Sequence, residues 1–418
     1  MKLNSLFFCD IVYHKGILYV KDEDLNSCPL AFVDDSQSFD VNIKPLSSAP
    51  IAFDLDALPK LHTPVVSTQP HENILHHLWD GLYPSWLTFY LCFPYLASDD
   101  YIPIFQQYGA HGVSKNHQIT KKFTGHQTIP LHFLSDPNFG PDCVLDLLDN
   151  PEDPFVIKYF VSSRIPDARL GIYCDLHFSH MGRAYVPEFY RDPVDRFIDR
   201  MYLRYNIRRN QNAFDLKDVL ILNNKRPYQG LQALISKASH KHKDFNFKYI
   251  NFDDYLHPSN HDTLKVKQDH FTYINDIAYT DDFESQLNLF NNARLVISGP
   301  STSRARTPFL PHGGIEIQMH THGSTNKTIV MNDNNTISNI SRYYKVLNVP
   351  YYSVEENQSK SVSPFVETFI DSALHMNSLR LPLNNLENLH PIIQKMNREG
   401  VKDSSLMVNC SHVKQYID

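Results

Sequence analysis

The sequence has no closely spaced cysteine pair, no long apolar run and no excess of basic residues. Its six cysteines form no CxxC pair, which argues against a zinc ribbon or redox motif and favours reduced thiols in a reducing compartment. No stretch of about 18 apolar residues exists, so we expect no membrane span; peripheral association with a membrane stays open. The 39 lysines and arginines are outnumbered by 46 aspartates and glutamates, so nucleic acid is not an expected partner.

The amino-terminal segment MKLNSLFFCDIVYHKG lacks the pattern of a secretory signal. Its apolar stretch is short and is interrupted by Asp10, so it is more typical of a first buried strand. We therefore expect a cytoplasmic protein.

The chain is long enough for more than one domain. Its 418 residues suggest two or three domains at roughly 150 residues each. With 42% hydrophobic residues, it can bury a core without a metal or a disulfide to hold it.

The first half predicts short strands and one helix. Turn residues separate the apolar runs LFFCDIVYH, ILYVKD and LAFVDD, and polar loops separate YIPIF, CVLDLL and FVIKYFVSS, a pattern that favours strands. Apolar residues at mixed spacings of three and four predict a helix in the first half of 72–96, broken near Pro84.

The second half predicts a parallel sheet. An arginine-rich helix over 186–213, with Phe197, Met201 and Tyr205 recurring every four residues, is a candidate linker. After it, the strand-like segments DVLILNN, FNFKYINFDD, RLVISG and IEIQM alternate with the helical segments QGLQALISKAS and FESQLNLFNNA. This alternation is typical of an α/β fold with a doubly wound parallel sheet. We expect domains at 1–212 and 213–350, and a tail of helices at 351–418 packing back across them.

A histidine-rich segment in the predicted helix is the first candidate site. In HENILHHLWDGLYP, Asn73, His76 or His77, and Asp80 follow at spacings of three and four, which place them on one helical face. A histidine and a carboxylate on one face can form an acid–base pair that takes a proton from an attacking hydroxyl. The alternative is an N-terminal helical turn with a histidine in a satisfied hydrogen bond.

Two segments that follow predicted strands are candidate phosphate sites. After RLVISG come Ser301, Thr302 and Ser303 with Arg304 and Arg306, and after DVLIL comes Arg226. Hydroxyls and backbone N–H groups at a strand-to-helix turn can hold a phosphate, and arginines can neutralise a leaving diphosphate. The alternative is an ordinary polar loop in each place. Asp54 and Asp56 form a DxD pattern that could bind a metal, although such a pattern is common by chance.

Together these segments resemble glycosyltransferase family 61, in the same order along the chain. Asn73, His76, Asp80 and Pro84 fill the places of a family motif. The segment DVLILNNKRP, the helix–strand FESQLNLFNNARLVIS, the segment FLPHGGIEIQM and the Tyr-rich RYYKVLNVPYYSV are similar to four later family segments.

The resemblance implies a GT-B fold, in which two Rossmann-like doubly wound domains face an active-site cleft. It implies inversion at the anomeric carbon and a UDP-sugar donor, with no cofactor and no essential metal. A nucleotide-sugar such as UDP-xylose or UDP-GlcNAc and a glycan or glycoconjugate acceptor would be the partners. The catalytic residues would be His76 and Asp80, with Asn73 and His77 on the acceptor side.

The donor side departs from the family pattern. Pro300-Ser301-Thr302 replaces a His-Gly-Ala sequence, Gln318 takes the place of an acidic residue with Glu316 two positions earlier, and Arg226 is the arginine nearest to a Ser-Arg position. Donor contacts would come from Arg226, Ser301, Thr302, Ser303, Arg304, Arg306, Glu316 and Gln318.

Three alternatives stay open. The chain could be a degenerate family member that binds glycans or acts as a scaffold, a GT-A enzyme that uses Asp54 and Asp56 with manganese, or an α/β protein of other function.

Overall fold

The structure, a computed structural model, divides into two compact units. The described residues up to 162 belong to the first unit, and those from 188 onward belong to the second. None of the helices in the described part of the chain has the length and apolar character needed to cross a lipid bilayer. The described residues are 6–23, 43–68, 74–92, 100–105, 116–162, 188–222, 230–252, 272–277, 283–298, 302–319, 337–339, 345–349 and 365–375.

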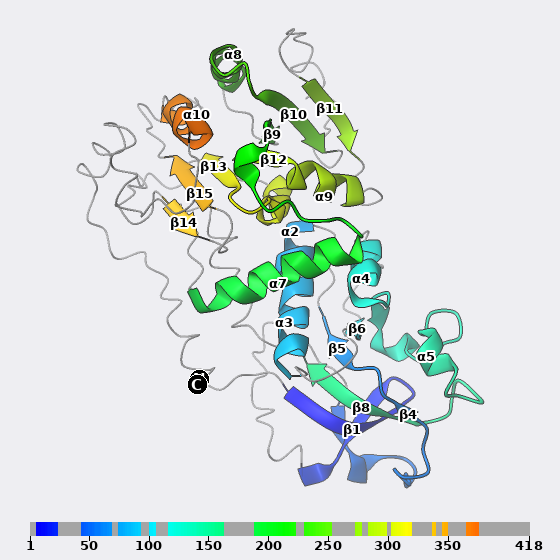
Figure 1. The fold of residues 1–418 in the computed structure, drawn as a ribbon. Coiled ribbons are helices and arrows are strands. Elements are labelled where there is room, and N and C mark those ends of the chain that lie inside the picture. The colour runs from blue at the N-terminus through cyan, green and yellow to red at the C-terminus, as the bar shows by residue number, and fades with distance from the viewer. Residues whose placement is uncertain are drawn as a thin grey trace, which may run out of the picture. The chain divides into compact units, whose positions relative to one another are not determined.

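The described part of the first unit is built on an eight-stranded mixed sheet (Figure 1). The strands in spatial order are β3 (Ile43–Pro45), β2 (Ile17–Val20), β1 (Leu6–His14), β8 (Phe155–Ser162), β5 (Val65–Ser67), β6 (Ile102–Phe105) and β7 (Ile129–Pro130), with β4 (Lys60–Leu61) beside β8. β1 runs antiparallel to β2 and β8, whereas β8, β5, β6 and β7 are parallel to one another. Of the predicted strands, LFFCDIVYH, ILYVKD, YIPIF and FVIKYFVSS are confirmed, and LAFVDD lies outside the described residues.

From Ile11 to Tyr13, the side chains of β1 alternate between the two faces of this sheet. Ile11 and Tyr13 join a large core cluster with strands β5, β6 and β8. Val12 points to the other face, where it packs with Tyr19 and Val156. Successive side chains of a strand face opposite sides, so the second half of β1, from Ile11 to His14, is buried on both faces.

The helix after β5 is longer than the sequence predicts. It comprises α2 (Ile74–His76), a π-helical turn η2 (His77–Leu82) and α3 (Tyr83–Cys92). The predicted break near Pro84 is wrong, because the helix runs from η2 through this proline into α3, and Pro84 follows the π turn closely. Buried aromatic residues hold the helix in place, and Trp79, Tyr83 and Trp86 form successive ring contacts of 5.9 and 6.0 Å between centroids.

One predicted strand of the first unit is a short helix instead. CVLDLL was expected to be extended, but α5 (Asp142–Leu145) covers its first half. The helix begins directly after Pro141 with an acidic first turn, a favourable start for a helix, and a short apolar run cannot by itself distinguish strand from helix. The remaining helices described in this unit are η1 (Leu46–Ser48), α4 (His117–Thr124) and η3 (Leu131–Phe133).

The described part of the second unit contains a seven-stranded sheet (Figure 1). In spatial order its strands are β11 (Thr272–Ile277), β10 (Asn246–Phe252), β9 (Asp218–Leu222), β12 (Ala293–Ser298), β13 (Ile315–Met319), β15 (Lys345–Val349) and β14 (Ile337–Asn339). All neighbours are parallel except β14 and β15. Without β14, the chain order across the sheet is 3-2-1-4-5-6, the order of a doubly wound nucleotide-binding sheet. The predicted α/β fold with mainly parallel strands is confirmed.

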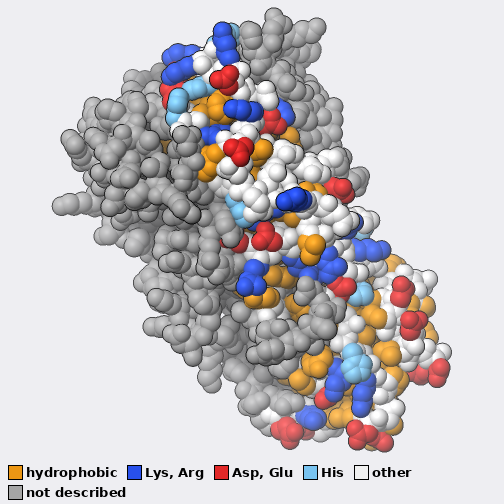
Figure 2. Space-filling view, in the orientation of Figure 1, with side chains coloured by type: hydrophobic (Ala, Val, Ile, Leu, Met, Phe, Trp, Pro, Cys, Tyr) orange, Lys and Arg blue, Asp and Glu red, His pale blue; other side chains and the backbone are white. Residues whose placement is uncertain are grey.

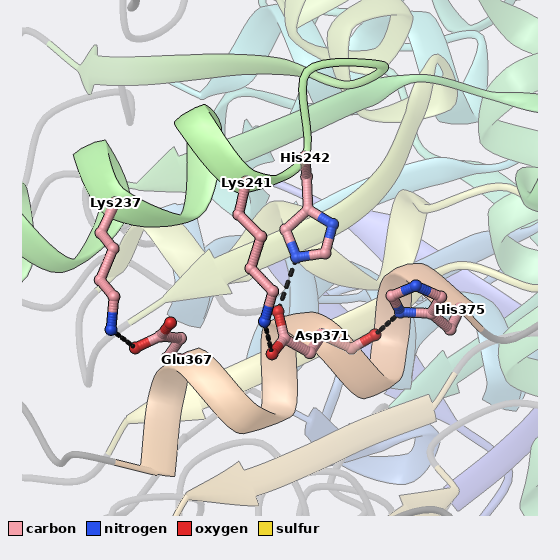
Figure 3. A network of polar contacts seen from close by, with 6 residues as sticks. All are labelled: Lys237, Lys241, His242, Glu367, Asp371 and His375. Carbon is pink, nitrogen blue, oxygen red and sulfur yellow. Dashed lines mark hydrogen bonds and ion pairs between the residues drawn. The ribbon is translucent and has the colours of Figure 1, made fainter.

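Helices α8 (Leu231–Lys241) and α10 (Phe365–His375) pack on one face of this sheet. Apolar side chains of both helices join alternate residues of β9, β10, β12 and β13 in one core cluster. Polar contacts also join the two helices, as Figure 3 shows: Lys237 pairs with Glu367 at 2.8 Å, and Asp371 accepts from Lys241 at 2.5 Å and from His242 at 2.6 Å. The predicted helix QGLQALISKAS is therefore confirmed, and α10 of the predicted tail belongs to this unit.

Aromatic contacts join three further helical elements of the second unit: α7 (Glu188–Arg204), α9 (Phe283–Asn291) and the 3₁₀ helix η9 (Thr302–Phe309). Phe283 lies 5.9 Å from Phe309 and 5.7 Å from Tyr205, between ring centroids. Phe197 and Met201 lie on the buried side of α7, and Tyr205, which is also buried, follows directly after its last residue. A further 3₁₀ helix, η6 (Ala213–Asp215), precedes β9. The expected domain limits at 212 and 350 stay predictions.

Candidate functional site

The strand order of the second unit reverses between β9 and β12. From β9 the chain continues through β10 and β11 to one side, and through β12 and β13 to the other. β9 and β12 are adjacent and parallel, with Ile297 opposite Ile221, so their carboxyl ends, Leu222 and Ser298, lie at the same edge. Ligands of doubly wound sheets bind outside the carboxyl ends at such a reversal.

Both predicted phosphate segments leave the sheet at this edge. One follows Leu222 and the other follows Ser298. Arg226 and Ser301 lie outside the described residues. Thr302, Ser303 and Arg304 form the first turn of η9, and only their backbone is described.

A buried carboxylate lies beside this segment. Glu316 of β13 is fully buried, and its two oxygens accept one hydroxyl each, from Ser298 at 2.5 Å and from Thr307 at 2.9 Å. Ser298 ends β12, and Thr307 lies near the end of η9. The structure shows that Glu316 makes hydrogen bonds within the protein, and its predicted donor contact stays a prediction.

Arg306 and Gln318 are also buried. The Arg306 side chain is 1% exposed, and its Nε donates to Oε1 of Gln286 on α9. Gln318 is fully buried on β13, opposite Ser298 in the strand register. The predicted donor contacts of these two buried residues stay predictions.

His312 lies away from this edge, although it belongs to the segment FLPHGG. It precedes β13, at the amino end of that strand, where its backbone oxygen accepts from the Ala213 N–H at 2.7 Å. Burial, with the Arg209 charge as a second cause, lowers the pKa of His312 to about 4. The imidazole is neutral at pH 7.

In the first unit, the π turn η2 follows the carboxyl end of β5. The Ser85 hydroxyl donates to the carbonyl oxygen of Gly81 at 2.7 Å and lies 2.8 Å from the Thr68 hydroxyl. Thr68 comes directly after β5, and its N–H donates to the carbonyl oxygen of Ile104 at 2.7 Å. These bonds tie the π turn to the strand end. Single π turns inside helices occur frequently at functional sites.

The predicted catalytic residues lie in this helix. His76 ends α2 and Asp80 lies within η2, four residues apart in one continuous helix; the structure describes their backbone only. Asn73 lies outside the described residues. His77 is 3% exposed, and its Nε2 lies 2.9 Å from the Thr120 hydroxyl of α4. This contact anchors the helix. The predicted place of His77 beside the glycan acceptor stays a prediction.

Asp54 and Asp56 form part of an exposed turn. The Asp54 carboxylate accepts from the Asp56 N–H at 3.1 Å, a common use of aspartate in turns. Among the described residues, no group of three or more histidine, cysteine, aspartate or glutamate side chains is arranged to hold a metal ion. Figure 2 shows cationic and anionic side chains interspersed over the described surface in that view.

Sequence reasoning missed the hydroxyl residues Thr68, Ser85 and Thr307, and it placed Ser298 in the phosphate loop without its bond to Glu316. All four are visible in the sequence, and Thr307 borders the predicted phosphate loop. Which hydroxyl meets which acceptor depends on strand register and on the π turn, and neither leaves a signal in a single sequence.

The chain was compared with known families and proteins. No family model matches it, and no curated protein matches it significantly.

Proposed function

We propose that the chain is an inverting glycosyltransferase that transfers a sugar from a nucleotide-sugar donor, a UDP-sugar, to a hydroxyl of a glycan acceptor. The observation that supports this most is the place of the two predicted phosphate segments. They follow β9 and β12, the neighbouring strands at which the sheet order reverses, and such a reversal is where doubly wound sheets bind nucleotides.

In this proposal the second unit binds the donor diphosphate. The backbone of η9 and the predicted loop residues hold the phosphates, and Arg226 and Arg304 neutralise their charge. The GT-B arrangement, the independence from metal and the cytoplasmic location that the sequence suggests are parts of the same proposal.

The first unit binds the acceptor and supplies the base. The acceptor oxygen attacks the anomeric carbon, and the bond from that carbon to the diphosphate oxygen breaks with inversion. His76 or Asp80 takes the hydroxyl proton, and UDP leaves with the bonding electron pair.

The base assignment predicts a loss of turnover in two variants. His76→Ala and Asp80→Ala should each lower kcat, and the variant that removes the base should lower it by about 10²–10⁴-fold, with the unfolding temperature near that of the wild type. The measurement is release of UDP from a panel of UDP-sugars with mixed glycan acceptors. His240→Ala, at an exposed histidine of α8, is the matched control. Two variants as active as this control would contradict the assignment.

A non-catalytic, glycan-binding member of the family is the second candidate. Pro300-Ser301-Thr302 in place of the family's His-Gly-Ala favours it. In that case the protein would bind to glycans on an array, but it would release no UDP from any UDP-sugar.

A further inference from the structure

The buried carboxylate of Glu316 needs an explanation. It lies on β13 between Ile315 and Ile317, which belong to the apolar core on the other face. Removing a carboxylate from water costs several kcal/mol, and an apolar residue at the same place often stabilises a protein as well or better. Stability of the sheet alone therefore does not account for Glu316.

The partners of Glu316 indicate what it holds. Because β12 and β13 are parallel, the connection between them must return from the carboxyl edge to the amino edge, and η9 is part of this return. Glu316 bonds to Ser298, where the connection leaves β12, and to Thr307 in η9. One carboxylate thus fixes both the start and the returning part of the connection.

Two further contacts of the described residues hold the second half of η9, where Thr307 also lies. The Tyr202 hydroxyl donates to the carbonyl oxygen of Phe309, and Arg306 donates to Gln286. Of these contacts, only those of Glu316 reach back to the carboxyl edge, through Ser298.

We propose that Glu316 is a positioning residue: it holds η9 against the sheet, so that the first turn of η9 is preorganised for the donor diphosphate. This inference rests on the proposed function. A site that is already ordered binds more tightly, because binding does not have to order it.

The test separates hydroxyl chemistry from packing. Thr307→Val keeps the shape but removes the hydroxyl, whereas Thr307→Ser keeps the hydroxyl but removes a methyl group. Glu316→Gln replaces one acceptor oxygen with a donor. Glu367→Gln, which removes a carboxylate on α10 in the same unit, is the matched control.

Two quantities are measured for each full-length variant, well below its unfolding temperature: amide hydrogen exchange in residues 302–309 and the Kd for UDP. In T307V and E316Q we expect exchange at least about tenfold faster and a Kd about tenfold higher, equivalent to about 1.4 kcal/mol. T307S and E367Q should stay within about twofold of the wild type.

Three results would overturn the inference. These are unchanged exchange in both T307V and E316Q, an effect of T307S as large as that of T307V, and faster exchange with an unchanged Kd. A wild-type protein that binds no UDP would instead contradict the proposed UDP-sugar function, and the exchange rates would still decide whether Glu316 fixes η9.

Discussion

At the scale of single residues, buried polar side chains connect segments that lie far apart in the sequence. Arg294 is 3% exposed at the start of β12. Its guanidinium donates to the carbonyl oxygens of Phe214 at 2.6 Å and Leu374 at 2.9 Å, and lies 5.2 Å from the centre of the Phe214 ring. One side chain therefore joins β12 to η6 and to the end of α10.

Replacing Arg294 should show how much its planar guanidinium group contributes to the free energy of unfolding. Arg294→Lys keeps the charge, but a lysine cannot span both carbonyl oxygens and stack on a ring. We expect the free energy of unfolding to fall by about 2 kcal/mol, measured by urea denaturation followed by far-UV circular dichroism. Arg208→Lys, at an exposed arginine of the same unit, should change it by less than about 0.5 kcal/mol. Equal stability of the two variants would refute this role.

At the scale of elements, α10 combines an apolar face with an ionic contact to α8. Burial by itself would raise the pKa of Asp371, but the hydrogen bonds from Lys241 and His242 outweigh it and hold this pKa below its ordinary value. The unfolded chain therefore binds this proton more readily than the folded chain does. The contribution of Asp371 to stability is present above its unfolded pKa, about 3.9, and is lost as the pH falls through the lower folded value.

This linkage gives a prediction for the docking of α10. Asp371→Asn should destabilise the protein by about 1.5 kcal/mol at pH 7 and speed amide exchange in 365–375, and the difference from the wild type should shrink below about pH 4. Glu367→Gln, whose partner Lys237 is largely exposed, should cost less than about 0.5 kcal/mol. A difference between D371N and the wild type that stays constant down to pH 3 would show that the Asp371 carboxylate does not carry the effect.

Sequence periodicity predicted the elements better than their boundaries and contacts. The strands at 218–222 and 293–298 carry short continuous apolar runs, which are typical of buried parallel strands. The strands at 246–252 and 315–319 alternate apolar and polar residues. The π turn at 77–82 was not predictable, because it depends on hydrogen bonds from Thr68 and Ser85. The bond between Glu316 and Thr307 depends on the path of η9, which sequence spacing does not encode.

At the scale of the whole molecule, the two units share a plan. In each, the strand order reverses around one strand, β5 in the first unit and β9 in the second. The strands β8, β5, β6 and β7 stand in the chain order 4-1-2-3, and β12, β9, β10 and β11 do the same. The candidate catalytic helix follows the first strand of one set, β5, and a candidate phosphate segment follows the first strand of the other, β9. The predicted site segments thus occupy equivalent positions in the two units, which supports the proposal of two nucleotide-binding-type folds.

The central claim is that the protein binds a nucleotide-sugar. The most direct test is the unfolding temperature of the purified protein with a chelator and a panel of nucleotides and nucleotide sugars. A ligand that binds only the folded state at 100 times its Kd adds about 2.7 kcal/mol, which raises the unfolding temperature of a domain of this size by about 5 °C or more. We predict such a rise with UDP and with one UDP-sugar. The absence of a rise with every nucleotide tested would contradict the claim.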